Sequence, residues 1–478
     1  MRRSLQCLSL ILALTLLCCA CAHSEKSAPT LSLYMDISTT DVESLAMVRE
    51  ALDAYVYEKL GFHVQLHSPD SYGQTLTEDL RAGVQVDAAM VFSGIGTLAA
   101  EGLVMPLDEL LETKGEGIAR SINEAYIRDA RINGHLYAFP TNRDRHTTYG
   151  FAYNQDIADQ YGLDLSGVTK LDDLTPIFAQ LQTQTTEITP SVVVSSTPIY
   201  GIMDSLGDSF AVLTFDDIDK VVNYYETEEF ETIIRLIYDW NQAGYLLDQS
   251  TEGGSYTYYL GSGQILGSLV RGHAIFAAQE SKFGESNVSY IALTPACYTA
   301  SNASRLGYAI PTTALDPELS MELLNLLYTD TYAANLLMYG IEDVHYTRCP
   351  YNENVLCYPD IQTPEHYTGM DPWKYCNQYA ADRWNVYEEG IWEKVEQANL
   401  SAVRSPAVGF SFDSTPVSRQ YQNCSDVVDE YMPILKAGLV DPDEILPEFL
   451  QALEAAGAEA VITEKQRQLD QYILSSNQ

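Results

Sequence analysis

Residues 31–92 alternate regularly between short apolar segments and amphipathic segments, and this alternation constrains the fold more than any other feature. The segment "LSLYMD" predicts a buried strand, and "FHVQLH" and "DAAMVF" predict two more. Between them, Thr40 and Glu43 form a capping box ahead of apolar residues at helical spacing that end at Gly61, and a second helix is expected over 76–82. Because strand–helix–strand units place consecutive strands in parallel, this stretch predicts a parallel α/β lobe.

The same alternation continues to the end of the chain. The segments "GHLYAFP" and "YGFAYN" predict strands, and helices are expected over 173–184, 228–243 and 318–337, separated by short apolar runs such as "HAIFAA", "YIAL" and "GYAIP". The last segment predicts two helices broken near Gly457. A chain of 478 residues exceeds the size of about 250–300 residues at which single cores stop growing, so two lobes are expected.

The first 21 residues, "MRRSLQCLSLILALTLLCCAC", predict a secretory signal. Two arginines precede an apolar run that is too short for a spanning helix of about 20 residues. The end of the segment resembles a bacterial lipobox, with Cys21 after Ala20 as the best lipidation site and Cys19, with Leu16 three residues before it, as the second choice. Simple secretion without a lipid is the alternative. We expect lipidation.

The charge of the chain excludes one class of partner. The formal net charge is −39, and removal of residues 1–20 takes away two bases and no acid. Nucleic acid is excluded as a partner because phosphate binding requires a basic surface.

The cysteines after the signal are scattered and odd in number, which does not form a disulfide framework. Two alternatives stay open: Cys349 and Cys357 form a disulfide bridge, or these cysteines are free, partly buried thiols. No C-x-x-C follows the signal.

Signatures of catalysis and of metal binding are missing. The chain has no G-x-S-x-G, no H-E-x-x-H and no Walker loop. His63 and His67 flank a predicted strand, where four residues separate them by roughly 13 Å, so they are expected at the surface rather than on zinc. We therefore assign no catalytic residue, no metal and no cofactor.

Several stretches, taken in order, resemble bacterial extracellular solute-binding proteins, the family that includes maltose-binding protein and supplies ABC importers. They are "AAEGLVMPLDELL", "INGHLYAFP", "YGFAYNQDIADQYGLDLSGVTKLDDL" and "LGYAIPTTALDPELSMELLNLLYTDTYAANLLMYGIEDVHY". "WKYCNQYAADRW" resembles the W-x-x-GNQ stretch of a lipoprotein subgroup, with Cys376 in place of the usual glycine, and "FSFDSTPVSRQYQN" with the terminal helices resembles its C-terminal module.

This resemblance implies an α/β, two-lobed fold with a hinge and an interlobe cleft that closes on a ligand. The expected domains are a signal peptide over 1–20, a tether over 21–30, lobe 1 over 31–145 and 312–345, lobe 2 over 146–311 and 346–407, and a C-terminal helical module over 408–478 packed on the lobes. The chain would leave lobe 1 near 143–148, return near 307–312 and cross again after about His345.

The segment "RDRH", Arg143, Asp144, Arg145 and His146, reads by itself as an acid/base cluster. Its place between two predicted strands at the first crossing favours a hinge or cleft-rim role over a solvated loop or a catalytic one. Arg143 is also expected to reach the ligand with paired hydrogen bonds.

The ligand expected from the resemblance is a carbohydrate, which aromatic rings and hydrogen-bonding side chains would bind. The residues chosen for this role follow predicted strands, open a helix or lie in the W-x-x-GNQ stretch; they are Asp36, Ser38, Tyr72, Ser93, Gly94, Arg143, Trp373, Tyr375 and Asn377.

The leading hypothesis is a monomeric, lipid-anchored protein on the extracellular face of a bacterial cell membrane that hands a saccharide, an oligosaccharide in the first place, to ABC permease subunits. A peptide or amino-acid derivative as ligand, and a surface glycan-processing enzyme, are the alternatives. The sequence does not identify the ligand, because a cleft assembled from three crossing segments sets its shape.

Overall fold

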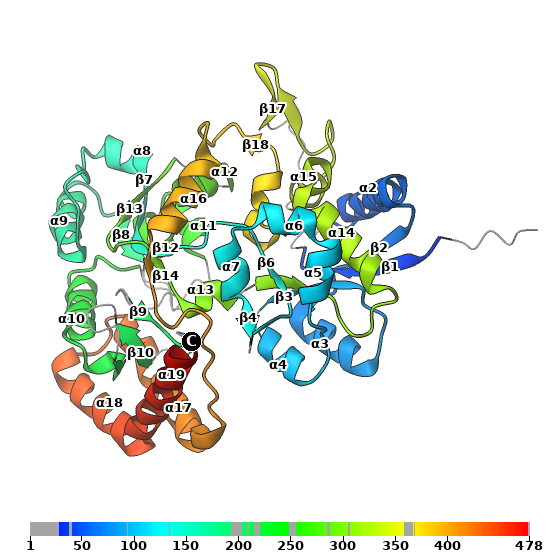
Figure 1. Cartoon of the computed structure of the whole chain (residues 1–478). Helices are drawn as coiled ribbons and strands as arrows, with labels where there is room; N and C mark the ends of the chain where they lie inside the picture. The colour runs from blue at the N-terminus through cyan, green and yellow to red at the C-terminus, as the bar shows by residue number, and fades with distance from the viewer. Residues whose placement is uncertain are drawn as a thin grey trace, which may run out of the picture.

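The computed structural model describes residues 28–37, 41–92, 94–132, 134–192, 203–207, 210–214, 220–247, 255–283, 287–304, 306–357, 367 and 369–476. These residues form two lobes and a helical module, seen in Figure 1 with lobe 1 on the right, lobe 2 at the upper left and the module at the lower left. Cys19, Cys21, Ser38, Thr40 and Ser93 lie outside the described residues. The two-lobed α/β fold with C-terminal helices is the one predicted.

Lobe 1 is built on a five-stranded sheet in the order β2-β1-β3-β15-β6. The strands are β1 (Thr30–Tyr34), β2 (His63–His67), β3 (Ala88–Phe92), β6 (Phe139–Pro140) and β15 (Leu306–Ala309). The first three pair in parallel, as the alternation predicted, whereas β15 runs antiparallel to β3 and β6. A small hairpin of β4 (Arg131–Ile132) and β5 (His135–Leu136) precedes β6.

Helices cover both faces of this sheet. In Figure 1, α2 (Val42–Leu60) lies above the sheet and α3 (Tyr72–Ala82) below it. The chain moves from β1 outward to β2 and then back past β1 to β3. Right-handed connections in these two opposite directions place the two helices on opposite faces. The remaining helices of the lobe are α4 (Ile95–Ala100), α5 (Asp108–Lys114), α6 (Glu116–Ser121), α7 (Glu124–Asp129), α14 (Pro317–Thr329) and α15 (Thr331–Tyr339).

Local chemistry explains where these helices begin and end. Asp41 caps α2 by accepting a hydrogen bond from Glu43 N, and the helix ends at Gly61, whose φ of 77° suits a residue without Cβ. The single helix expected over 318–337 is two, because Asp330 ends α14 and its side chain caps α15 by accepting from Ala333 N. The alternating pattern therefore located the helices, but a capping carboxylate divided one of them.

Lobe 2 contains a four-stranded sheet in the order β13-β7-β12-β8. Its strands are β7 (Thr148–Asn154), β8 (Thr189–Val192), β12 (Ile265–Gly272) and β13 (Val288–Ala292), and β12 pairs antiparallel with β7 but in parallel with β8. Around it lie α8 (Gln155–Gln160), η1 (Leu171–Asp173), α9 (Leu174–Gln184), η2 (Tyr224–Glu226), α10 (Glu228–Gln242), α11 (Tyr256–Gly261) and α12 (Phe276–Phe283). The apolar run "HAIFAA" thus starts helix α12.

The C-terminal module packs on lobe 2. It consists of η5 (Thr415–Val417), α17 (Ser418–Lys436), α18 (Pro442–Ala456) and α19 (Ala458–Ser476), with the predicted break at Gly457, where φ is 101°. It covers a small sheet of β9 (Met203–Asp204), β10 (Ala211–Thr214) and β11 (Val221–Asn223), and one hydrophobic core continues from lobe 2 into the module. The fully buried Lys465 donates from Nζ to Ala211 O at 2.9 Å and anchors α19 to β10.

A hairpin projects at the top of Figure 1 from lobe 1. It is formed by β16 (Thr347–Cys349) and β17 (Asn352–Cys357), with β18 (Arg383–Trp384) beside β17. Cys349 and Cys357 are joined by a disulfide, which resolves the alternative that the sequence left open.

The lobe boundaries differ from those expected. Strand β15, placed in lobe 2 by the sequence, belongs to the lobe 1 sheet, so the second crossing ends before Leu306. The segment over 346–407 does not form part of lobe 2 either: most of its buried residues, including Tyr346, Tyr375 and Val395, belong to the lobe 1 core, and the core of lobe 2 resumes at Ala407. The strands of this segment are short and do not join the sheet of either lobe, so its apolar residues did not reveal which core they fill.

Candidate functional site

Three segments connect the lobes, and they lie side by side. The first runs from β6 to β7, the second from β14 (Cys297–Tyr298) through α13 (Ala300–Ser304) to β15, and the third from α16 (Ile391–Ser401) to β19 (Val403–Arg404). Thr147 and Cys297 exchange two backbone hydrogen bonds of 2.8 and 2.9 Å, and Cys297 also pairs with Val403. The third crossing therefore comes at about residue 402, not after His345.

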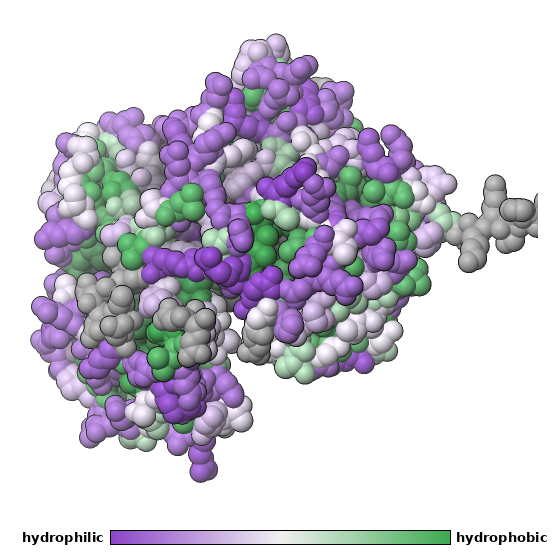
Figure 2. Space-filling view, in the orientation of Figure 1, coloured by the Kyte–Doolittle hydropathy of each residue, from purple (hydrophilic) through white to green (hydrophobic). Residues whose placement is uncertain are grey.

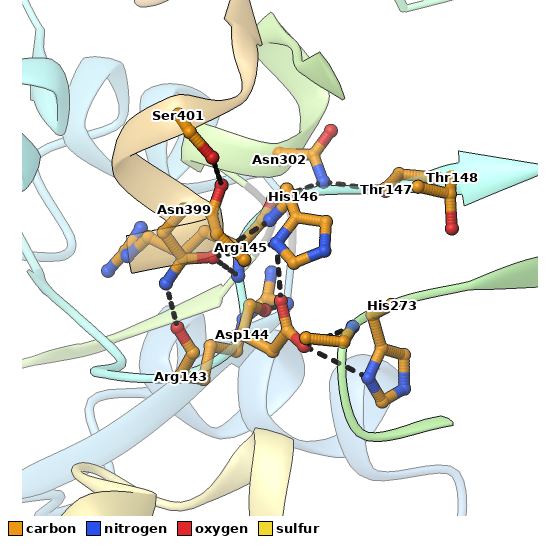
Figure 3. A network of polar contacts seen from close by, with 12 residues as sticks. Arg143, Asp144, Arg145, His146, Thr147, Thr148, His273, Asn302, Asn399 and Ser401 are labelled. Atoms are coloured by element: carbon orange, nitrogen blue, oxygen red, sulfur yellow. Dashed lines mark hydrogen bonds and ion pairs between the residues drawn. The ribbon is translucent and has the colours of Figure 1, made fainter. Parts of the chain in front are cut away.

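The "RDRH" segment forms the first connection and is buried throughout. Figure 3 shows Asp144 between two imidazoles. Its Oδ1 lies 3.0 Å from His146 Nδ1, and its Oδ2 lies 3.1 Å from His273 Nδ1 and accepts from Ala274 N at 3.0 Å. His273 follows the carboxyl end of β12, so Asp144 ties the first crossing to lobe 2.

The charge distribution of this cluster follows from its contacts. Burial opposes the charge of Asp144, but the interactions with His146 and His273 outweigh it and hold the pKa of this carboxyl well below its ordinary value. Burial likewise opposes the charge of His146, yet the Asp144 carboxylate raises the pKa of that imidazole. The cluster is thus a buried ion pair held in place by its neighbours.

Asn399, near the end of α16, holds the same segment from the lobe 1 side. Its Oδ1 accepts from Arg145 N at 2.8 Å and from His146 N at 3.2 Å, and its Nδ2 donates to Arg143 O at 3.0 Å (Figure 3). The sequence gave no signal for Asn399, since a single asparagine more than 250 positions away carries no pattern.

The two arginines of this segment have different environments. The guanidinium of Arg145 lies 4.3 Å from the centre of the Tyr126 ring and donates to Thr141 O. Arg143, a predicted ligand contact, is buried and donates from Nη1 to Asp144 O at 2.7 Å. Both arginines therefore contribute to the conformation of the crossing.

Lobe 1 presents a group of polar and aromatic side chains at the carboxyl ends of β1 and β3. Lys374 Nζ lies 2.8 Å from Asp36 Oδ2 and 3.3 Å from Asp371 Oδ2. The Trp373 ring packs edge-on against Phe92 with centroids 5.8 Å apart, and Phe92 is 43% exposed. Asp36 and Trp373, both selected from the sequence, are thereby brought together with Lys374 and Phe92, which were not selected.

Lobe 2 faces this group with the segment that follows β12. Burial raises the pKa of Glu280 in α12, and the Asp371 carboxylate of lobe 1 raises it further, whereas His273 and a hydrogen bond from Tyr256 lower it. We call these residues the interlobe surface: Asp36, Phe92, Asp371, Trp373 and Lys374 of lobe 1, with His273 and Glu280 of lobe 2.

Other selected residues lie inside lobe 1. Tyr72 is buried, with its hydroxyl 2.8 Å from Tyr34 O and 2.9 Å from Met90 O. Tyr375 is fully buried and donates to Leu327 O, and Asn377 donates to Tyr328 O. Their polar atoms are already satisfied within the lobe, so the packing gives no support to the prediction that these three side chains contact a ligand. Gly94, with φ of 75°, stands at the start of α4.

In the described ranges, no group of three or more His, Cys, Asp or Glu side chains is placed to hold a metal ion. None of the helices found there has both the length and the apolar character needed to cross a membrane.

Comparison with known proteins identifies the family. Residues 42–334 match the family of bacterial extracellular solute-binding proteins, which is more than half of the chain. The chain belongs to this family. Residues 406–474, the C-terminal module, match a domain of unknown function, DUF3502. As a member of this family the protein acts on the outer side of the cytoplasmic membrane, and the family consists of binding proteins rather than enzymes.

Relatives cover nearly the whole chain. A carbohydrate ABC transporter substrate-binding protein of Streptococcus pneumoniae serotype 4 (strain ATCC BAA-334 / TIGR4) is 25% identical over 474 residues, which span 94% of this chain and 93% of that protein. The crystal structure of the N-glycan transport solute binding protein NgtS from Streptococcus pneumoniae superposes with a TM-score of 0.86 at 22% identity, covering 94% of this chain and all of that one. The same protein in complex with Man5GlcNAc gives a TM-score of 0.74 at 23% identity, covering 94% and 99% of the two chains.

Proposed function

We propose that the protein captures a carbohydrate, an oligosaccharide in the first place, between its lobes and delivers it to the permease of an ABC transporter. The observation that carries this proposal is the interlobe surface, where an aromatic pair, Trp373 and Phe92, stands beside the ion pairs of Lys374. Sugar rings bind through an apolar CH face on an aromatic ring and through hydroxyls on charged and amide groups. The similar proteins support the same ligand class, since one is named a carbohydrate ABC transporter substrate-binding protein and another has a structure in complex with Man5GlcNAc.

Anchoring and stoichiometry belong to the same proposal. Lipidation of Cys21 would hold a monomer at the outer face of the membrane, with the tether over 21–30 between lipid and lobe 1. Lipoproteins of this type carry more than one acyl chain, which makes anchoring stable. Mass spectrometry of the membrane fraction tests this point, and an N-terminus without lipid at Cys21 or Cys19 contradicts it.

A thermal-shift screen of residues 22–478 tests the ligand class. Neutral oligosaccharides built of mannose and N-acetylglucosamine, peptides and amino-acid derivatives are compared at equal concentration, because a ligand at 100 times its dissociation constant adds about 2.7 kcal/mol to the stability. Stabilisation by a saccharide supports the proposal, and stabilisation by peptides alone contradicts it. Hydrolysis of the saccharide in the same samples would show that the protein is an enzyme.

A further inference from the structure

A cavity of about 380 Å³ lies between lobe 2, the hinge and helix α17 of the C-terminal module. Its size falls within the range of about 300–1,000 Å³ that is usual for small-molecule sites. We propose that this cavity is a second binding site, for a small organic anion with an apolar body, and that the C-terminal module serves to form one of its walls.

The cavity is distinct from the interlobe surface. Alternate residues of a strand point to opposite faces of a sheet. In β7, one residue points toward the interlobe side and the next points into the cavity. Thr148 contacts the hydroxyl of Tyr290, whose ring packs on Phe276 of α12 at the interlobe side. Tyr149 lines the cavity instead, and its hydroxyl accepts from Arg271 Nη2 at 3.1 Å. No residue of the interlobe surface lines the cavity.

The charges around the cavity favour an anion. Arg271, from the end of β12, and Lys436, from the end of α17, line different walls, whereas Asp429 is the one carboxylate among its described lining residues. This balance is the reverse of that in the whole chain, which has 66 acids and 27 bases. Burial lowers the pKa of the Lys436 ammonium, so a bound anion would favour its charged form.

The rest of the lining specifies the body of the ligand. Met203 of β9, Tyr224 of η2 and Met432 of α17 are buried and offer apolar and polarisable surface. The amide of Asn302 in α13 also lines the cavity, but it already donates to Arg145 O and Thr147 Oγ1. Methionine side chains adapt to ligands of irregular shape. The combination fits an acid that carries one aromatic ring or a short alkyl chain, rather than inorganic phosphate.

The test compares acids with their neutral amides on the mature chain, residues 22–478. Indole-3-acetate, 4-hydroxyphenylacetate and hexanoate are titrated by calorimetry, each beside its amide. We expect at least one acid to bind at least about tenfold more tightly than its amide. Lys436→Gln should remove that difference, whereas Lys170→Gln, at an exposed surface position, should leave it unchanged.

A second set of measurements locates the binding. Trp373→Ala should leave acid binding intact, and hydrogen exchange of residues 428–436 should slow when the acid is added. The proposal is overturned if no acid binds more tightly than about 5 mM, if acid and amide bind equally, or if Trp373→Ala abolishes acid binding. Should Lys436→Gln fail to fold, Arg271→Gln provides the same comparison from the β12 side of the cavity.

Discussion

The hinge cluster and the interlobe surface meet at His273 and are both built on ion pairs, but they differ in the exposure of their carboxylates. In the hinge, Asp144 lies between two histidines and its side chain is 5% exposed. At the interlobe surface, Lys374 is itself buried, but it lies between two carboxylates, of which Asp36 is 35% and Asp371 is 45% exposed. A fully buried pair fixes geometry because losing one partner leaves an unpaired charge, whereas a carboxylate that water reaches can be replaced by a ligand. Variants of the hinge should therefore change stability, and variants of the interlobe surface should change affinity.

The largest effect is expected for Asp144→Asn. The neutral side chain cannot pair with His146 and His273, and breaking a buried ion pair costs about 3 kcal/mol of the free energy of unfolding. Urea denaturation of residues 22–478 at pH 6 measures it. The control Asp53→Asn affects the exposed pair with His63 and should cost about 1 kcal/mol or less. Equal losses in the two variants would contradict a structural role for Asp144.

Asn399→Ala should cost about 2 kcal/mol, because the backbone N–H groups of Arg145 and His146 lose their common acceptor inside the protein. The matched control is Asn352→Ala, which removes a side chain that accepts from Asn354 N at the exposed hairpin and should cost under about 0.5 kcal/mol. If Asn399→Ala is as harmless as the control, α16 does not hold the hinge.

Trp373→Ala should weaken saccharide binding by about tenfold or more, equivalent to about 1.4 kcal/mol, while the protein stays folded. The loss comes from the aromatic surface that Trp373 offers together with Phe92. Calorimetry with the saccharide found in the screen measures it. Tyr351→Ala removes an aromatic ring that is 72% exposed on the hairpin and should leave affinity unchanged. Unchanged affinity in Trp373→Ala would remove this residue from the site.

The smallest expected effect is a dependence of stability on pH. The folded pKa of His146 is raised, so its contribution is complete below the unfolded value of about 6.5 and is lost as pH rises through the folded pKa. The folded pKa of Asp144 is lowered, so its contribution is present above about pH 4 and is lost in stronger acid.

Denaturation at pH 6 and pH 8.5 separates these two contributions, since only that of His146 changes in this interval. The free energy of unfolding should fall more in the wild type than in His146→Gln. An identical change in both proteins would mean that His146 does not titrate in the pair.

Much of lobe 1 was predictable because its pattern is local. The strands β1, β2 and β3 and the helices between them follow from the spacing of apolar residues within 31–92 and from Gly61. The same reasoning missed the sheet position of β15 and the lobe to which 346–400 belongs, because pairing and core membership depend on segments far away in the chain.

The candidate site was predictable only in part for a related reason. Asp36 and Trp373 were chosen from their position after a strand and in a family motif, and both lie at the interlobe surface. Tyr72, Tyr375 and Asn377 were chosen by the same criteria, yet their polar atoms are satisfied inside lobe 1. Sequence position does not say which way a side chain points when its backbone lies in a loop or a short helical turn.

The sequence by itself determined the α/β alternation, the acidic surface and the family, because composition, periodicity and ordered motifs are properties of the chain. Figure 2 shows one face of the molecule, which is mostly hydrophilic with several apolar patches. Only the tertiary structure decided that "RDRH" is a buried connection held by Asn399 and His273, and that the C-terminal module closes a cavity beside it. These features join residues separated by more than a hundred positions, and such contacts exist only once the cores have packed.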